Sequence, residues 1–191
     1  MVLTNDDNSY FEMRIVDKFP EGVNISEDEV AASPTPNTYG IMRGMKAWIQ
    51  RVAHASVTID GELVSKIGKG YLVLLGVTHT DTEAAADKIA ARIPVLRLFT
   101  DANGQMNLSL EDVGGSVIVV SQFTLYADTA HGRRPGFSSA ARPELAEPLY
   151  ERVVARLREL LGSARVGTGR FGAEMQVELL NDGPVSIELL A

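Results

Sequence analysis

Seven consecutive residues, Tyr-Leu-Val-Leu-Leu-Gly-Val at positions 71–77, limit the folds open to this 191-residue chain more than any other segment. A short apolar run of this kind is typical of a buried strand, and it is far too short to span a bilayer. Strand-like segments with turn signals between them precede it along the chain. They are residues 47–53, residues 56–60 with a turn at Gly61, and residues 63–67 with a turn at 68–70. This order predicts a β-meander.

Two helices are expected after the meander. Thr80 and Glu83 have the spacing of a capping box, in which each side chain satisfies a free backbone N–H, so a helix is expected from there to Arg92, before Pro94. The second helix is expected over residues 143–161, with Gly162 as its stop. Its predicted buried face consists of Leu145, Leu149, Val153, Leu157 and either Leu160 or Leu161.

Further strands are expected over residues 95–99, 116–123, 173–180 and 185–190, with a turn at 101–104. A long loop rich in Gly, Arg and Pro occupies residues 127–139, and loops of that length usually carry function. Strands in runs with two helices predict the α+β class, as a mostly antiparallel β-barrel or sandwich in a single domain.

The domain is expected to span residues 45–191, because residues 1–44 have a different character. They hold eight acidic and three basic residues, a net charge of −5, so the remaining chain carries only −2 of the total −7. They also lack sustained periodicity and end in a segment rich in Pro, Ala and Ser, a composition that buries too little apolar area to offset the entropy of ordering. We therefore expect a disordered extension, and Met45 is a plausible start of a shorter protein.

Several kinds of catalytic site are excluded by missing residues. The chain has no cysteine, so it has no thiolate nucleophile and no Cys-based zinc site, and its three histidines lack ligand spacing. No Gly-x-Ser-x-Gly or His-Glu-x-x-His motif is present. The segment Gly-Thr-Gly-Arg-Phe-Gly at 167–172 matches the dinucleotide fingerprint in letters, but it follows a helix and precedes a strand, the reverse of a pyrophosphate-binding turn. We expect no metal, no cofactor, no membrane segment and a cytoplasmic location.

A polar cluster at the end of an apolar strand is the first candidate site. Ser121, Gln122, Phe123 and Thr124 lead into the Arg-rich loop, and strand ends can present fixed donors that stabilise a developing oxyanion. The same alternation also fits the solvent face of an edge strand. Asn-Asp-Gly at 181–183 would by itself be a hairpin turn, but Pro184 follows, and X-Pro bonds are where cis peptides are accessible.

Four segments together resemble the D-aminoacyl-tRNA deacylases. They are Ile-Gln-Arg-Val at 49–52, Ser-Gln-Phe-Thr-Leu at 121–125, Gly-Arg-Arg-Pro-Gly-Phe at 132–137, and Asn-Asp-Gly-Pro-Val-Ser at 181–186. The resemblance covers nearly all of residues 45–191. It departs from the family pattern at Ser186, usually Thr, and at Gly136, usually Ser.

The resemblance implies a homodimer with active sites at the subunit boundary and a tRNA carrying a D-amino acid, or glycine, as substrate. The element Gly183-Pro184, cis in that family, would reach into the partner's pocket and exclude L side chains with its carbonyls. Arg51 would hold this element, while Ser121, Gln122 and Phe123 would line the adenosine and ester end. Thr124 would lie near the scissile bond, and Arg134, Phe137 and Ser186 would complete the substrate-binding set.

Two mechanisms are open at this stage. Thr124 could act as a nucleophile, but that requires an activating base nearby. The resemblance favours a route in which the neighbouring ribose 2′-hydroxyl positions or activates water while N–H groups near Gln122 and Phe123 stabilise the oxyanion. A different class of function is also open: a non-catalytic module that binds RNA 3′ ends through the Arg loop and stacking on Phe123 or Phe137.

Overall fold

The computed structural model describes residues 11–16 and 44–191, and their largest element is one mixed seven-stranded sheet. The strand order is β1-β9-β2-β4-β7-β8, with β3 paired to β2 beside this path. The strands are β1 Phe11–Val16, β2 Lys46–Ile59, β3 Glu62–Ile67, β4 Gly70–Gly76, β7 Ser116–Ser121, β8 Val166–Thr168 and β9 Glu174–Leu190. A separate ladder joins β5 Phe99–Thr100 to β6 Met106–Leu108. The helices are α2 Glu83–Arg92 and α3 Pro143–Leu161, and the 3-10 turns are η1 Phe123–Tyr126 and η2 Ser163–Arg165.

Strand β4 lies at the centre of the sheet, and all seven of its residues are buried. It pairs antiparallel with β2 on one side and parallel with β7 on the other. Because side chains alternate along a strand, Tyr71, Val73 and Leu75 enter the core beneath the helices, whereas Leu72 and Leu74 enter a second core on the opposite face. Burial on both faces explains the unbroken apolar run and confirms the predicted buried strand.

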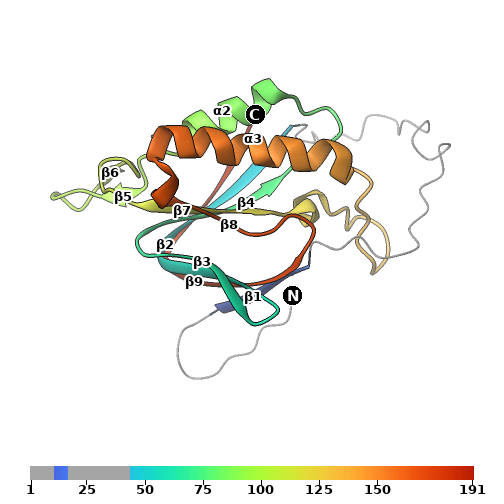
Figure 1. Ribbon diagram of the computed structural model, residues 1–191, viewed down its shortest axis with the longest axis horizontal. Helices are drawn as coiled ribbons and strands as arrows, with labels where there is room; N and C mark the ends of the chain where they lie inside the picture. The colour runs from blue at the N-terminus through green and yellow to red at the C-terminus, as the bar shows by residue number, and fades with distance from the viewer. Residues whose placement is uncertain (1–10, 17–43) are drawn as a thin grey trace.

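Helices α2 and α3 lie next to each other over one face of the sheet (Figure 1). The buried side of α3 includes Leu149, Val153 and Leu157, as the spacing predicted. Arg152 of α3 ties the two helices together, because its Nε and Nη2 donate to the two carboxylate oxygens of Asp87 at 2.9 and 2.8 Å. Burial drives this packing, and the ion pair fixes its register.

The other face of the sheet curls around the second core. Figure 1 shows β3, β9 and β1 curving beneath β4, β7 and β8. The gap between the curled part and β8 is bridged where the Ser65 hydroxyl donates to the Thr168 carbonyl at 3.0 Å. The predicted fold class, a mostly antiparallel α+β barrel with two main helices, is confirmed, although the β4–β7 and β7–β8 pairings are parallel.

Several predicted strand limits are wrong. Residues 46–59 form one strand rather than two, because β2 pairs along its length with β3, β4 and β9. The expected strand at 95–99 reduces to β5, since Val95 is exposed and the Arg97 Nε donates to the Asn107 carbonyl. The expected strand at 116–123 ends at Ser121, and β8 was not predicted.

Two details of the helices also differ from expectation. Thr82, not Thr80, caps α2, and its hydroxyl accepts from the Ala85 N–H at 3.4 Å. The hydroxyl two residues closer to the helix satisfies the orphan donor, so the predicted capping box does not form. Leu145 of α3 is exposed, whereas the prediction that either Leu160 or Leu161 is buried is confirmed by Leu161. None of the helices in the described residues is long and apolar enough to cross a membrane.

The N-terminal extension contributes one strand to the sheet. Strand β1 runs antiparallel to β9, with Phe11 opposite Leu179 and Val16 opposite Glu174. Within the predicted extension, these six residues pair with the strand edge that β9 presents, and the expectation for the extension as a whole stays a prediction. Residues 1–10 and 17–43 of the predicted extension lie outside the described residues.

Candidate active site

A pocket of about 200 Å³ opens where β4 and β7 end beside α3. One wall is the polar cluster that follows β7, and the other walls come from α3, the segment before it and the segment before β9. The walls include Leu75, Ser121, Gln122, Phe123, Ala141, Ala146, Tyr150 and Phe171. The lining is mostly apolar, with a few polar groups at one side, which is the usual composition of a small-molecule site.

Gln122 occupies a fixed position on the polar side of this pocket. It is only 6% exposed, and its main-chain N–H donates to the Leu75 carbonyl at 2.8 Å, which continues the β4–β7 ladder by one bond. Its side-chain Nε2 donates to the Thr124 hydroxyl at 2.6 Å. An amide nitrogen carries two hydrogens, so the same group can also offer a donor to a ligand.

The Thr124 hydroxyl is therefore an acceptor in this arrangement. Nucleophilic activation would require a base that accepts its proton, and the contact recorded for this oxygen is the Gln122 donor. Of the three histidines, His79 bonds to the Ser138 carbonyl, His54 lies 3.8 Å from Glu178 on β9, and His131 is exposed in the loop. The described residues thus provide a positioned hydroxyl rather than a nucleophile–base pair.

The Arg-rich loop meets the pocket through Phe137. Its ring lies against Phe123 edge to face, with centroids 4.9 Å apart. Phe123 begins η1, so the expected strand has already turned away at this point, and that turn places the aromatic ring beside the loop. Arg134 of the same loop is exposed.

The segment around Gly183 and Pro184 bulges out of β9. Gln50 pairs with Ser186 and Val52 with Asn181, so four residues of β9 lie opposite the single residue Arg51. Extra residues on one strand interrupt the ladder and turn their peptide groups away from the sheet. The Gly183-Pro184 peptide bond is cis, and both residues are exposed. The strand continues in the same direction afterwards, so the segment is not a hairpin.

Arg51 supports this bulge from inside the protein. The side chain is buried, its Nε donates to the Asp182 carbonyl at 2.8 Å, and its Nη1 donates to the Leu98 carbonyl at 2.5 Å. On the outer side, the Asn181 Oδ1 accepts from the Val185 N–H at 2.8 Å, and the Asn181 amide donates to the Ser186 hydroxyl at 3.2 Å. The peptide groups between these contacts are held in one orientation.

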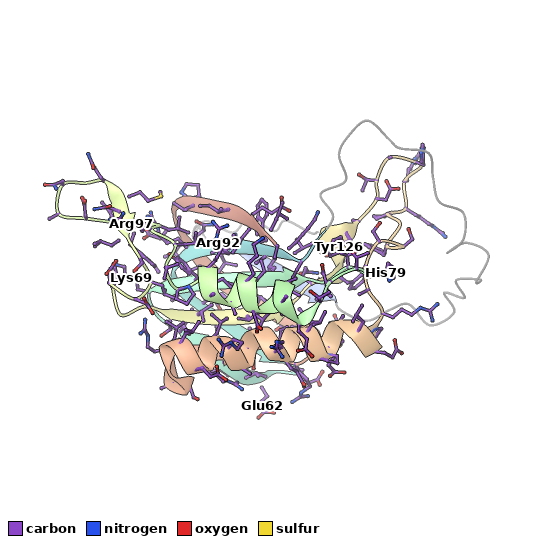
Figure 2. All side chains as sticks on the ribbon, turned by 90° about the horizontal axis from the view of Figure 1, so that it is seen from above. Glu62, Lys69, His79, Arg92, Arg97 and Tyr126 are labelled. Carbon is purple, nitrogen blue, oxygen red and sulfur yellow. The ribbon has the colours of Figure 1, made fainter. Side chains whose placement is uncertain are left out.

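The two sets of candidate residues lie apart within one chain. Arg51 pairs with Tyr71 on β4, whereas Gln122 bonds to Leu75, four residues farther along that strand, a separation of about 13 Å at strand rise. In Figure 2, Lys69 and Arg97 lie towards one end of the molecule and His79 and Tyr126 towards the other. Ser121, Gln122, Phe123, Thr124 and Phe137 gather at the pocket, and Arg51, Gly183, Pro184 and Ser186 gather at the opposite end.

The model of the D-Tyr-tRNA(Tyr) deacylase family matches residues 48–190, which include both sets of residues. The chain belongs to this family. A D-aminoacyl-tRNA deacylase of Symbiobacterium thermophilum is 57% identical over 143 residues, 75% of this chain and 93% of the relative. The corresponding protein of Clostridioides difficile is 54% identical over 145 residues, 76% of this chain and 96% of the relative.

Two solved structures share the fold of this chain. A c-Myc DNA unwinding element binding protein superposes with a TM-score of 0.72 at 41% identity, over 76% of this chain and 98% of that one. A probable eukaryotic D-amino acid tRNA deacylase superposes with a TM-score of 0.67 at 16% identity, over 77% and 100%, which shows the shared fold.

Sequence reasoning missed most of the residues that line the pocket. Tyr150 and Ala146 of α3 and Phe171 line it, and the Tyr150 hydroxyl donates to the Val119 carbonyl at 3.0 Å. A signal existed for Tyr150, since it lies three residues before the predicted core residue Val153 on the same helical face. Phe171 offered no such signal, because it lies in the segment Gly-Thr-Gly-Arg-Phe-Gly, which has no apolar periodicity.

Proposed function

We propose that this protein hydrolyses the ester bond of D-aminoacyl-tRNA at a site assembled from two subunits. Membership of the deacylase family supports the reaction. The observation that carries the composite site is the separation described above: within one subunit, the anchor points of the donor cluster and of the Gly183-Pro184 bulge lie about 13 Å apart along β4. A partner related by a two-fold axis would place the second element of one chain over the pocket of the other.

The pocket is the half that receives the end of the tRNA. Tyr150 and Phe171 offer apolar surface to the terminal adenine, with ring centroids 5.9 Å apart, and Gln122 and Thr124 lie at the side where the ester would be held. Single-stranded RNA ends are commonly recognised by stacking on aromatic side chains together with a few hydrogen bonds. The apolar lining also excludes bulk water from the ester, which strengthens the hydrogen bonds within the pocket.

The Gly183-Pro184 bulge is the half that reads chirality. Its exposed main-chain carbonyls, held by Arg51 and Asn181, would face the α-carbon of the bound amino acid and collide with an L side chain. Glycine has no side chain to reject, so glycyl-tRNA is a second expected substrate. Backbone atoms suit this task, because their position depends on the fold and not on a rotamer.

Water, positioned by the ribose 2′-hydroxyl of the terminal adenosine, attacks the ester carbonyl. The tetrahedral oxyanion needs a hydrogen-bond donor at the pocket wall. The Gln122 main-chain N–H is already committed to Leu75, so the Gln122 side-chain amide is the donor that this residue can provide. Collapse of the intermediate breaks the bond to the ribose oxygen, which takes up a proton, and a free D-amino acid leaves.

The test of the reaction is a hydrolysis time course on one tRNA charged with the D or the L form of the same amino acid. The D ester should disappear and the L ester should persist. Protection of both esters would support a non-catalytic module that binds RNA ends, and equal turnover of both would remove the chiral filter.

Subunit complementation tests the composite site. Ala146→Phe should block the pocket of its own chain, and Gly183→Val should displace the bulge that its chain donates so that the bulge obstructs the pocket of the partner. Randomly mixed dimers of the two variants contain one intact site in each heterodimer, so activity should recover to about a quarter of the wild-type value. Recovery requires unfolding and refolding the variants together, and a mixture that stays inactive while wild-type protein refolds to full activity would contradict the shared site.

The Thr124→Ala variant separates the two mechanisms. Because the Thr124 hydroxyl accepts from Gln122, its loss removes one hydrogen bond, and kcat should fall only about five- to tenfold, roughly 1 kcal/mol. A fall of several orders of magnitude in single-turnover assays, with substrate binding retained, would instead identify Thr124 as the nucleophile.

A further inference from the structure

We propose that Thr78 and His79 are positioning residues that hold residues 127–140 as a preformed cationic arm beside the pocket, where the arm contacts phosphates of the tRNA beyond its terminal adenosine. This inference rests on the proposed function, since it assigns the same site a means of holding the body of its substrate.

The arm closes on itself near its base. The Asp128 N–H donates to the Gly136 carbonyl at 2.7 Å, and the Gly136 N–H donates back to the Asp128 carbonyl at 2.8 Å. The Asp128 carboxylate also accepts from the Ala130 N–H at 2.9 Å, which orders the chain just beyond this bridge. The seven residues between Asp128 and Gly136 therefore form a defined tip rather than an open coil.

The base of the arm is fastened to the segment that follows β4. The Thr78 hydroxyl donates to the Ser139 carbonyl at 2.7 Å, and the His79 Nε2 lies 2.8 Å from the Ser138 carbonyl, where the ring nitrogen must donate. Thr78 also forms an isolated antiparallel bridge with Ala140, and the next N–H, that of Ala141, donates to the Val77 carbonyl at 2.9 Å. The carbonyls of Ser138 and Ser139 are thus both bonded by side chains of the neighbouring residues His79 and Thr78.

Thr78 is itself held from beneath by a buried acid. Asp81 is 7% exposed, and its Oδ2 accepts from the Thr78 N–H at 2.8 Å. The Asp81 N–H in turn donates to the Thr78 carbonyl at 3.1 Å, which closes a tight turn. Because both main-chain groups of Thr78 are hydrogen-bonded, the backbone that carries the Thr78 hydroxyl and the His79 imidazole is held in place next to the arm.

The tip of the arm presents cationic side chains to solvent. Arg133 and Arg134 are exposed, and the ion pairs recorded for the described residues involve neither of them. His79 lies at the same end of the molecule as Tyr126, the last residue of the turn η1 that begins at Phe123 (Figure 2). Phe137 joins the arm to the pocket wall through its contact with Phe123. A positive, ordered tip next to a site for an RNA end suits phosphate contact at low entropic cost.

The variants that test the arm leave the pocket residues unchanged. The fastener variant, Thr78→Val with His79→Ala, removes both side chains that bond to the base of the arm. The single variant Thr78→Ser keeps a hydroxyl at position 78. Thr80→Val is the matched control, because Thr80 is exposed in the same segment and α2 is capped by Thr82 instead. Arg133→Ala with Arg134→Ala removes the charges of the tip.

The fastener variant should raise KM for D-aminoacyl-tRNA about tenfold while kcat stays within about twofold. Hydrolysis of a D-aminoacyl-adenosine ester, which lacks the phosphates, should be unchanged. Thr78→Ser should keep KM for D-aminoacyl-tRNA close to the wild-type value, and Thr80→Val should leave it unchanged. Combining the fastener and arginine variants should add little to either alone, because an arm that is no longer held cannot use its charges.

The contribution of the arm to tRNA affinity can be tested independently of catalysis. Fluorescence anisotropy measures the binding of uncharged tRNA across a series of salt concentrations. The fastener variant should bind more weakly and show a shallower salt dependence than wild type. If wild type binds tRNA in this way but hydrolyses no D ester, the proposed function fails and the arm stands. Unchanged tRNA affinity in the fastener variant, or equal losses on tRNA and adenosine esters, would overturn the arm.

Discussion

The two ends of the molecule present different kinds of surface, one made of side chains and the other of main-chain groups. At the pocket end, side chains define the surface: Gln122 is buried, hydrogen-bonded and set in an apolar wall. At the opposite end, an exposed bulge of main chain projects from β9, and the side chains of Arg51 and Asn181 serve only to hold it. A cavity can bind a ligand alone, whereas an ordered bulge of exposed peptide groups has its use against something outside its own chain.

The largest expected effect in testing this comparison comes from Arg51→Met. The Asp182 and Leu98 carbonyls would lose a charged donor, and the free energy of unfolding should fall by about 2–4 kcal/mol. Discrimination between D and L substrates should fall with it, because the bulge loses its inner support. Urea unfolding at one fixed protein concentration, followed by the fluorescence of the single tryptophan, measures the first effect.

Arg97→Met is the control for this change. Arg97 is exposed, and its Nε makes one bond to the Asn107 carbonyl, so the loss of stability should be small. Equal midpoints for the Arg51 and Arg97 variants would mean that the bulge does not depend on Arg51.

Filling the pocket should damage binding without damaging the fold. Ala146 lines the pocket from α3, and Ala146→Phe should raise KM for D-aminoacyl-tRNA at least about a hundredfold, about 2.7 kcal/mol of binding free energy. Leu145→Phe, at the exposed neighbouring position, should leave KM unchanged. Both variants should first be shown to keep the wild-type Tm. Similar KM values for the two variants on D-aminoacyl-tRNA would then mean that the ligand binds elsewhere.

The limits of sequence-based reasoning follow the same division. The burial of β4 and the extent of α3 were predictable because local patterns determine them: an unbroken apolar run and a helical stripe ended by Gly162. The single long β9 was not, because Asn-Asp-Gly-Pro reads locally as a turn, and only the pairing of residues on both sides of it with β2 keeps the strand going.

The candidate site shows the same contrast. Ser121 to Thr124 could be proposed from the polar residues at a strand end, and Phe123 and Phe137 do meet. The wall formed by Tyr150 and Phe171 depends on how α3 lies across the sheet, and no local pattern contains that information. The hydrogen bond from Arg51 to the Leu98 carbonyl joins residues 47 positions apart, so no local sequence pattern could predict it.

A pH-dependent effect is expected on the helical face, away from both ends. The hydrogen bond from Arg152 holds the pKa of Asp87 below its ordinary value of 3.8. A carboxylate with a lowered folded-state pKa stabilises the protein above 3.8, and this contribution is lost as the pH falls through the folded pKa. Asp87→Asn should therefore lower Tm slightly at pH 7 and by less at pH 3.

Glu62→Gln, on the exposed strand β3, is the control for the Asp87 variant. Its Tm relative to wild type should vary less between the two pH values. A constant offset between Asp87→Asn and wild type across the whole range would show that packing, and not the ion pair, joins α2 to α3.

The smallest effect is expected from Gly136→Ser, and it bears on which end of the molecule requires glycine. A Cβ at Gly136 would lie 3.9 Å from Asp128 atoms, an ordinary contact, so stability should change by less than about 0.5 kcal/mol and deacylation should be unaffected. A Cβ at Gly183 would instead lie 2.8 Å from the Val185 Cγ2 and 2.9 Å from the Arg51 Nη2, at a φ of +139° that L residues rarely adopt. Gly183→Ala should thus cost stability and chiral selectivity where Gly136→Ser costs neither, as paired urea and hydrolysis measurements would reveal. If the two glycines proved equally replaceable, the bulge would not need its exact backbone path, and main-chain recognition at that end would lose its physical basis.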